Sequence, residues 1–196
     1  MIERISTFDE KGSREGGVIW HTTGSGKSFT MVFFSKALIW LEDLAKCRVI
    51  VVTDRVDLET QLSQTFASGG VLSDRDKSDA MATSGRRLAQ QIGHGNERVI
   101  FSIINKFGSA VKYDECYNDS PNIIVMVDEG HRSQNGENNI RMAQACQTLL
   151  LLPLRVRHYL RMIRPKTNSA ASFTLIPCSK RSKTKRSRHC YTKSVS

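Results

Sequence analysis

The sequence contains no apolar run that approaches the length needed to cross a membrane. Its five cysteines include no pair at the spacing of a metal site or a C-x-x-C motif, so we expect free thiols. The first residues are polar and charged, which predicts that there is no secretory signal peptide. These absences favour a cytoplasmic protein. With 39% apolar and 24% charged residues, the 196-residue chain suits one α/β domain with a substantial core.

Acidic residues are also absent, but from one part of the chain only. Residues 146–196 contain 12 of the 29 Lys and Arg residues and none of the 19 Asp and Glu residues. The remaining 17 basic and 19 acidic residues lie in 1–145, so the formal net charge of +10 comes from the tail. A net charge of this size suggests a nucleic-acid partner. Its distribution removes that argument for the first 145 residues.

A glycine-rich loop follows a short apolar segment, residues 17–21, and opens a helical pattern. Residues 21–28 are His-Thr-Thr-Gly-Ser-Gly-Lys-Ser, with His21 where the usual motif has Gly. Such a loop points backbone N–H groups at an anion, and the helix N-terminus adds positive potential. We therefore predict an ATP site with Mg²⁺, in which Lys27 contacts the β- and γ-phosphates and Ser28 binds the metal. A turn that binds nothing is the alternative; the expected nucleotide-binding residues are Thr23, Gly24, Ser25, Gly26, Lys27 and Ser28.

Apolar segments alternate with helical patterns along the first 145 residues. Strands are predicted at 17–21, 48–53, 98–102 and 122–127, and helices at 27–46, 55–66 and 83–93. This alternation predicts an α/β fold with a mostly parallel sheet covered on both sides. In 27–46, spacings of three and four predict one buried face, made of Phe29, Val32, Phe33, Ala37, Leu38, Leu41 and Leu44. Residues 1–16 are expected to be an exposed, polar lead-in, and 67–82 a loop or a weak element.

Two carboxylates follow the fourth predicted strand directly. Asp128 and Glu129 would project from the carboxyl edge of a parallel sheet, where ligands bind. We expect Asp128 to hold Mg²⁺, and Glu129 to orient and deprotonate the attacking water. A solvated acidic turn is the alternative. Lys27, Asp128 and Glu129 are thus the first predicted catalytic residues.

Four stretches resemble, in the same order, the R (motor) subunit of type I restriction endonucleases: residues 16–28, 52–58, 104–107 and 127–134. Asp-Glu-x-His at 128–131 resembles the superfamily 2 helicase form, which implies a fourth catalytic residue, His131, that couples the ATP site to neighbouring motifs. A purely structural histidine is the alternative. The resemblance covers residues 1–145, with Gly130 in place of the more usual Ala. It implies a RecA-like P-loop NTPase lobe at 17–145.

The resemblance also implies a function. The family's R subunit is an ATP-driven translocase of double-stranded DNA, fused to a nuclease and assembled with specificity and methyltransferase subunits. Its counterparts of residues 53–55 and 102–106 face DNA, so we expect contacts to the phosphate backbone from Thr53, Arg55, Asn105 and Lys106. For Arg55 and Lys106, solvated surface charges are the alternative. The function could also be that of another superfamily 2 DNA or RNA helicase lobe, or of a non-catalytic product that binds nucleic acid.

The resemblance also sets limits on activity. Only about sixteen residues precede the first predicted strand, too few for the family's nuclease domain. The second motor lobe, which would supply an arginine finger, is missing as well. We therefore expect negligible ATP turnover from the isolated chain.

The tail departs from the family. After Ala145 the family continues with Leu-Pro-Asn-Ala and later Phe-Thr-Gly-Thr-Pro, and this sequence has neither. Codons for residues 145–149 can be chosen that encode Leu-Pro-Asn-Ala when read from the third base. Codons for 153–160 can likewise encode Phe-Thr-Gly-Thr-Pro-Leu-Leu in that same frame. We therefore predict a frameshift near 145–146, with 146–196 a disordered basic tail translated out of frame. A real basic arm at 180–188 that binds nucleic acid is the alternative.

Overall fold

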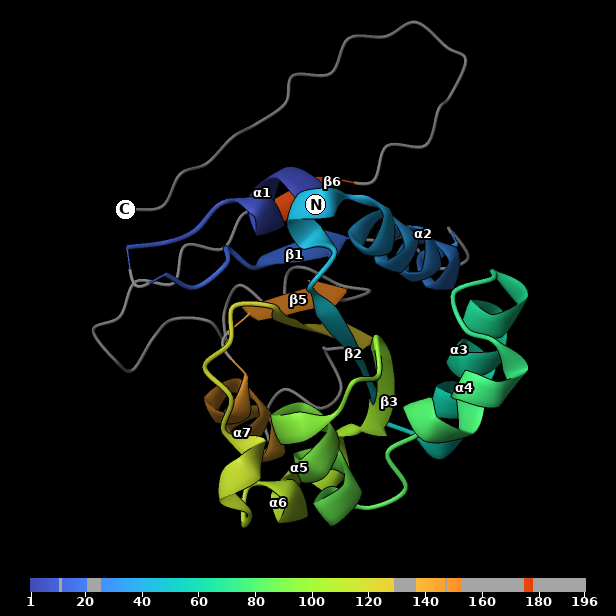
Figure 1. The fold of residues 1–196 in the computed structure, drawn as a ribbon, viewed down its shortest axis with the longest axis vertical. Coiled ribbons are helices and arrows are strands. Elements are labelled where there is room, and N and C mark those ends of the chain that lie inside the picture. Colours follow the sequence, from blue (N-terminus) through green and yellow to red (C-terminus); the bar gives the residue numbers. More distant parts are fainter. Residues whose placement is uncertain (11, 21–25, 129–136, 147, 153–174, 178–196) are drawn as a thin grey trace, which may run out of the picture.

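The computed structural model describes residues 1–10, 12–20, 26–128, 137–146, 148–152 and 175–177. A six-stranded sheet forms its centre, in the order β3-β2-β4-β5-β1-β6, and every pairing between these strands is parallel (Figure 1). The strands are β1 Gly17–Trp20, β2 Arg48–Thr53, β3 Val99–Ile103, β4 Ile123–Asp128, β5 Thr148–Leu152 and β6 Leu175–Pro177. The predicted α/β class and parallel sheet are confirmed.

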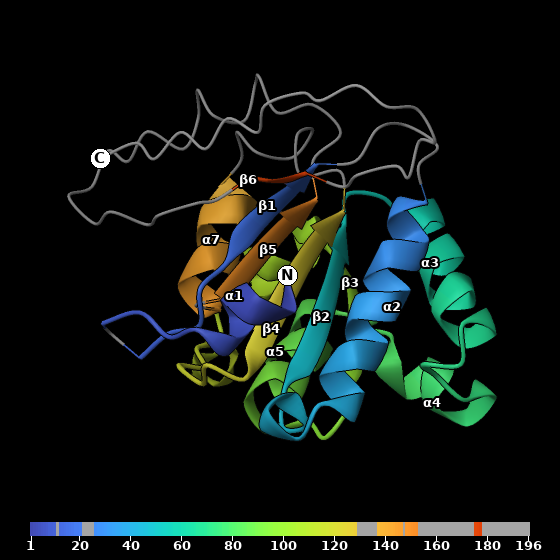
Figure 2. The same cartoon turned by 90° about the horizontal axis from the view of Figure 1, so that it is seen from above.

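Helices cover both faces of this sheet (Figures 1 and 2). One face carries α1 Ile2–Ser6, α2 Lys27–Trp40, α3 Val56–Ser68 and α4 Asp74–Ala80. The other carries α5 Gly85–His94, α6 Phe107–Ala110 and α7 Glu137–Ala145. Three short 3₁₀ turns connect these elements in the described residues: η1 Glu42–Leu44, η2 Ile104–Lys106 and η3 Asp114–Cys116. No described helix combines the length and apolar character that a membrane span requires.

The central strands are apolar on both faces because a helix layer covers each face. Along β4, Ile124 and Met126 join the core beneath α2 and α3, whereas Val125 and Val127 join the core beneath α5, α6 and α7. All six residues of β4 are buried. A parallel strand in this position needs a continuous apolar run, which explains why the sequence pattern located β2, β3 and β4 to within a residue.

The buried face of α2 differs from the prediction. The helix ends at Trp40, and its buried residues are Met31, Val32, Phe34, Ser35 and Leu38. Phe29 and Phe33, expected in the core, are 59% and 66% exposed. The helix carries apolar residues on more than one face, so spacing alone could not choose between them. In the folded chain it is the side containing Met31, Val32, Phe34 and Leu38 that packs into the core beside the sheet.

The two ends of the chain also differ in part from the expectations. Within the expected exposed lead-in, Ile5 of α1 lies in the core. Arg14 is buried and donates hydrogen bonds to Ile5 O (2.9 Å) and to Asn122 Oδ1 (3.0 Å). Within the expected disordered tail, residues 148–152 and 175–177 are strands on either side of β1. The remaining tail residues lie outside the described ranges.

Four of the described helices were not predicted: α1, α4, α6 and α7. The segment 67–82, expected as a loop or weak element, contains α4. Ser73 caps this helix, because its side-chain oxygen accepts a hydrogen bond from the Asp76 backbone N–H.

Candidate functional site

The first turn of α2 lies directly after the loop that follows β1. Gly26 is the N-cap, with φ of 82°, in the left-handed region that only glycine adopts without strain. No side chain among the described residues caps this helix end, and its first turn contains no acidic residue. The N-terminal N–H groups therefore lack a side-chain acceptor, which leaves the positive end of the helix suited to an anion.

Lys27 and Asp128 meet at this point. Lys27 is the first residue of α2 and Asp128 is the last residue of β4, and their Nζ and Oδ1 atoms form an ion pair. The strand before Lys27 is β1 and the strand that ends in Asp128 is β4; the two strands are not neighbours, because β5 lies between them. Both side chains are largely buried, at 13% and 7% exposed. A buried carboxylate requires a partner, and Lys27 supplies it.

These residues fit a nucleotide bound with a divalent metal. The ammonium of Lys27 and the free end of α2 suit phosphate oxygens, while the Asp128 carboxylate and the Ser28 hydroxyl are the oxygen ligands that Mg²⁺ prefers. The structure thus brings together Gly26, Lys27, Ser28 and Asp128. The other predicted residues of this site lie outside the described ranges: Thr23, Gly24, Ser25, Glu129 and His131.

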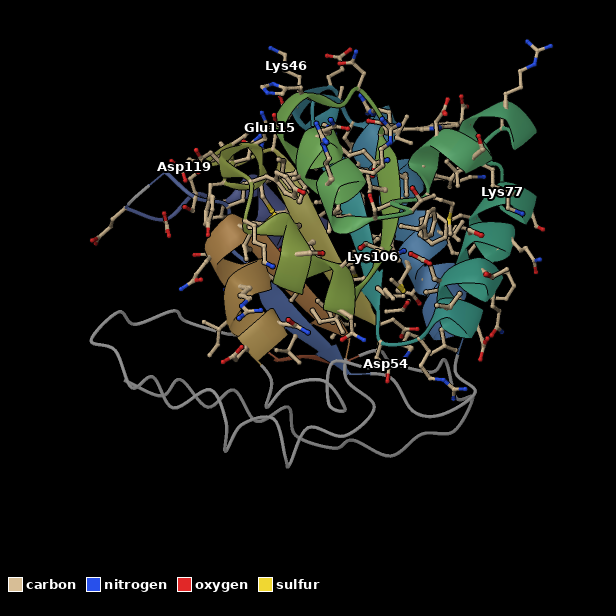
Figure 3. The ribbon with its side chains drawn as sticks, turned by 90° about the horizontal axis from the view of Figure 1, so that it is seen from below. Lys46, Asp54, Lys77, Lys106, Glu115 and Asp119 are labelled. Atoms are coloured by element: carbon tan, nitrogen blue, oxygen red, sulfur yellow. The ribbon has the colours of Figure 1, made fainter. Side chains whose placement is uncertain are left out.

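The residues expected to face DNA lie at the same edge of the sheet. β2 and β3 are parallel neighbours, with Thr53 opposite Ile103, so the segments that follow them lie side by side. Figure 3 shows Asp54, which follows β2, at the opposite end of the molecule from Lys46, Glu115 and Asp119. The carboxyl edge of the sheet therefore carries both the candidate nucleotide site and the predicted DNA contacts.

The four predicted DNA-contacting side chains differ in exposure. Thr53 is buried, and its hydroxyl donates a hydrogen bond to Arg55 O at 3.1 Å. Arg55 is 60% exposed and forms an ion pair of 3.1 Å with Asp57. Asn105 is exposed, and its side-chain oxygen accepts a hydrogen bond from Asn138 of α7. Only Arg55 and Asn105 of the four thus have exposed side chains.

The fourth, Lys106, is held by a partner that sequence reasoning missed. Its Nζ lies 3.0 Å from Oε1 and 3.3 Å from Oε2 of Glu59, a buried residue of α3. Residues 59 and 106 are far apart in the sequence, and the only local signal is the i, i+4 spacing of Glu59 from Arg55. That spacing would have paired Glu59 with the wrong cation.

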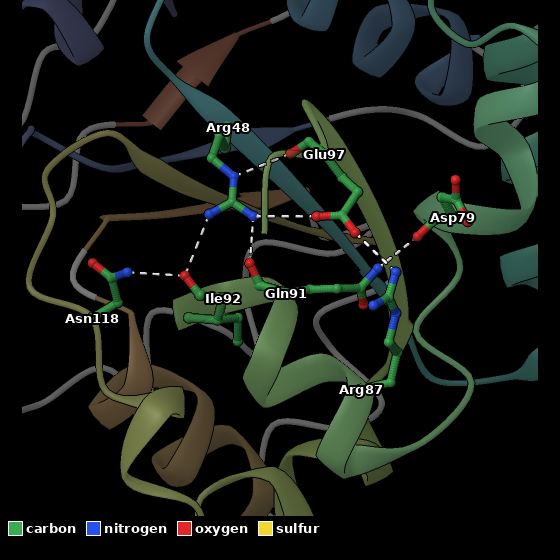
Figure 4. A network of polar contacts seen from close by, with 7 residues as sticks. All are labelled: Arg48, Asp79, Arg87, Gln91, Ile92, Glu97 and Asn118. Carbon is green, nitrogen blue, oxygen red and sulfur yellow. Dashed lines mark hydrogen bonds and ion pairs between the residues drawn. The ribbon is translucent and has the colours of Figure 1, made fainter. Parts of the chain in front are cut away.

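A second polar network, also unpredicted, lies at the amino end of β2 (Figure 4). Arg48 donates to the backbone oxygens of Glu97 (3.1 Å), Ile92 (3.3 Å) and Gln91, and its guanidinium lies 3.8 Å from the Glu97 carboxylate. Arg87 forms an ion pair of 3.0 Å with the same carboxylate. Burial lowers the pKa of Arg48, and the charge of Glu97 opposes that shift. A single Arg at the start of an apolar run gives no sign of this arrangement.

Comparison with known proteins identifies the family. The family model described as SWI2/SNF2 ATPase matches residues 1–189. The HindI type I restriction enzyme endonuclease subunit of Haemophilus influenzae is 43% identical over 138 residues, which are 67% of this chain and 13% of that protein. A Mycoplasma pneumoniae protein named as the C-terminal part of the MpnIIP type I restriction enzyme endonuclease subunit is 30% identical over 151 residues, 70% of this chain and 68% of that protein.

The solved structures agree on the fold. The helicase domain of Hef from Pyrococcus furiosus matches 83% of this chain and 35% of that one, with a TM-score of 0.54 at 12% identity. At that identity the likeness concerns the fold alone, a helicase lobe. The chain spans 13% of the length of the Haemophilus relative, so it corresponds to one piece of a much larger subunit. This chain therefore belongs to the SWI2/SNF2 ATPase family and, within it, to the endonuclease subunits of type I restriction enzymes.

Proposed function

We propose that this chain is the ATP-binding lobe of the DNA-translocating R subunit of a type I restriction endonuclease, a cytoplasmic complex that includes specificity and methyltransferase subunits. Family membership makes it part of an ATP-dependent hydrolase, which binds nucleotide with a divalent metal. The observation that carries the proposal is the Lys27–Asp128 ion pair at the free N-terminus of α2. It joins the two halves of a nucleotide site across β5.

Each charged group of this pair has a use when nucleotide binds. Lys27 exchanges Asp128 for the β- and γ-phosphates, and the N–H groups at the start of α2 contact the same anion. The Asp128 carboxylate and the Ser28 hydroxyl would hold Mg²⁺, which would supply positive charge beside the phosphates. The proposal includes five further residues. Glu129 is the base that deprotonates the attacking water, His131 couples the ATP site to neighbouring motifs, and the phosphate loop contains Thr23, Gly24 and Ser25.

Binding of a fluorescent ATP analogue tests this site. Lys27→Met should weaken Mg-dependent binding by about 100-fold or more, because it removes the cation that faces the phosphates. Lys36→Met, on the same helix but two turns away, is the matched control and should leave binding unchanged. Equal affinity in the Lys27 variant and the wild-type chain would exclude Lys27 from the nucleotide site.

The carboxyl edge of β2 and β3 is the proposed DNA surface. Thr53, Arg55, Asn105 and Lys106 all lie there, and Arg55 and Asn105 have the exposed side chains. A motor that moves along any sequence has to grip phosphates rather than bases. Arg55→Gln should therefore lower the affinity for any DNA duplex and reduce the slope of log affinity against log salt by about one. Lys46→Gln, at the opposite end of the molecule, should leave that slope unchanged.

Turnover is expected to need more than this lobe. The proposed site provides phosphate, metal and water contacts, but the arginine finger belongs to the second motor lobe in the family, and its absence costs several orders of magnitude in rate. The isolated chain should bind nucleotide and hydrolyse it negligibly, with or without DNA. DNA-stimulated hydrolysis at the rate of an intact motor would contradict this.

The frameshift is also a proposal. Residues 148–152 form β5 between β4 and β1, so the chain after Ala145 still supplies a strand of the sheet. The test is the coding DNA: read in the alternative frame from codon 145, it should encode Leu-Pro-Asn-Ala and later Phe-Thr-Gly-Thr-Pro. Stop codons, or an unrelated sequence in that frame, would favour a real basic arm.

A further inference from the structure

The Glu59–Lys106 pair joins the two segments of the proposed DNA surface. Glu59 lies in the first turns of α3, which follows β2, and Lys106 ends η2, which follows β3. The Glu59 side chain is 4% exposed and that of Lys106 is 16% exposed, and both carboxylate oxygens lie within 3.3 Å of Nζ. Each segment also carries one exposed candidate contact, Arg55 in the first and Asn105 in the second.

The geometry makes Lys106 unavailable to a phosphate. A carboxylate as buried as that of Glu59 depends on its counter-ion, and withdrawing the ammonium would leave an uncompensated charge in the interior. A DNA phosphate that captured Lys106 would have to offset that cost. Arg55 is in the opposite situation, because its partner Asp57 is 80% exposed and water can replace it freely.

The same pair sets the positions of Arg55 and Asn105. The backbone oxygen of Arg55 accepts hydrogen bonds from the Glu59 N–H and from the Thr53 hydroxyl, both at 3.1 Å. Asn105 immediately precedes Lys106 in η2. The ion pair therefore links the turn that holds Arg55 to the turn that holds Asn105.

We propose that Glu59 and Lys106 are positioning residues that fix the spacing between Arg55 and Asn105, and that Lys106 is not itself a phosphate contact. The use of this spacing for DNA rests on the function proposed above. The ion pair as a link between two segments does not rest on it, so the two can be tested apart.

Unfolding of the chain without DNA tests the link. Lys106→Met leaves Glu59 buried without a partner and should lower the folded-to-unfolded ratio by about 100-fold or more. Adding Glu59→Leu removes the stranded carboxylate and should restore most of that loss. The exposed pair Arg55 and Asp57 is the control. Arg55→Gln and Asp57→Asn should change the free energy of unfolding almost additively when they are combined. Additive effects at residues 59 and 106 would overturn the proposal.

Binding to a DNA duplex of mixed sequence tests the positioning role. Glu59→Gln raises the net charge by one, yet it should weaken binding several-fold with an unchanged salt slope, because Arg55 and Asn105 lose their fixed spacing. The Glu59→Leu, Lys106→Met double variant should also keep the wild-type slope, whereas Arg55→Gln should reduce it by about one. Tighter binding by Glu59→Gln, or a slope reduced by about one in the double variant, would show that Lys106 contacts phosphate and overturn the proposal. If the wild-type chain binds no duplex, the proposal of a DNA surface is wrong. The unfolding measurements on the Glu59 and Lys106 variants then decide alone whether this ion pair links the two segments.

Discussion

The two ends of the sheet hold their buried charges in different ways. At the amino end, the Arg48 guanidinium is held by three backbone oxygens as well as the Glu97 carboxylate (Figure 4). At the carboxyl end, Lys27 meets Asp128 through side chains from two different segments. Backbone oxygens cannot move away without unfolding the elements that carry them. A side-chain pair can open when a ligand offers each partner a replacement, so buried charge at the carboxyl end suits function and buried charge at the amino end suits stability.

The largest expected effect on stability is at the amino end. Arg48→Met removes the donor to three carbonyl oxygens and leaves the Glu97 carboxylate with Arg87 as its one ion-pair partner within the described ranges. It should destabilise the fold by about 4 kcal/mol. Arg75→Met, on the exposed surface of α4, should change the free energy of unfolding by less than about 0.5 kcal/mol. Chemical denaturation measures both. If Arg48→Met cost no more than its control, the distinction between the two ends would be lost.

The Lys27–Asp128 pair should behave differently from Arg48. Lys27→Met alone should destabilise the fold by about 3 kcal/mol, because Asp128 remains buried without its cation. Adding Asp128→Asn should recover most of that stability, since no backbone acceptor within the described residues depends on the Lys27 side chain. Nucleotide binding should stay lost in the double variant. Restored folding without restored binding would separate the stabilising role of the pair from its proposed function.

Two buried thiols, Cys116 and Cys146, predict that the free energy of unfolding depends on pH. Burial raises the pKa of Cys116 to about 11 and that of Cys146 to about 12, from an ordinary value of 9.0. A thiol with a raised folded-state pKa favours the fold fully below pH 9.0, and this contribution is lost as the pH rises toward the folded-state value.

The free energy of unfolding should therefore fall between pH 9 and 11, by about 2 to 3 kcal/mol for Cys116. Urea denaturation across this range measures the fall, and Cys116→Ala should reduce it. The quantity to compare is the difference in this fall between the wild-type chain and the Cys116→Ala chain. Parallel curves would show that Cys116 ionises equally well in the folded chain.

The sequence predicts the meeting of Lys27 and Asp128 better than it predicts the packing around them. Asp128 ends an apolar strand and Lys27 comes after the loop that follows another, and parallel strands bring such positions to one edge of the sheet. Their meeting could therefore be anticipated. The rotation of α2 could not, because Phe33 and Phe34 are equally apolar and only the tertiary structure buries the second.

Long-range charge pairs outside the sequence motifs of the candidate nucleotide site were beyond sequence reasoning. Glu59 and Lys106 meet because β2 and β3 are neighbours in the sheet. The order of strands in a sheet cannot be predicted from residue spacing or composition. Arg48 is a comparable case, since its acceptors are backbone oxygens that carry no residue identity. The sequence therefore predicts the edge of the sheet at which functional residues lie. It does not predict which side chains or backbone oxygens from different elements will pair.

The smallest expected effect is at Asp57, and it separates exposed pairs from buried ones at the carboxyl end. Asp57 is 80% exposed and its pair with Arg55 is open to solvent, so Asp57→Asn should change the free energy of unfolding by less than about 0.5 kcal/mol. The same change removes a negative charge beside the proposed phosphate contact, and duplex affinity at low salt should rise about two- to five-fold. Titration of a labelled duplex at two salt concentrations measures this gain, which should fade at high salt. An affinity that did not respond would place Arg55 away from the DNA, even though its side chain is exposed at this edge.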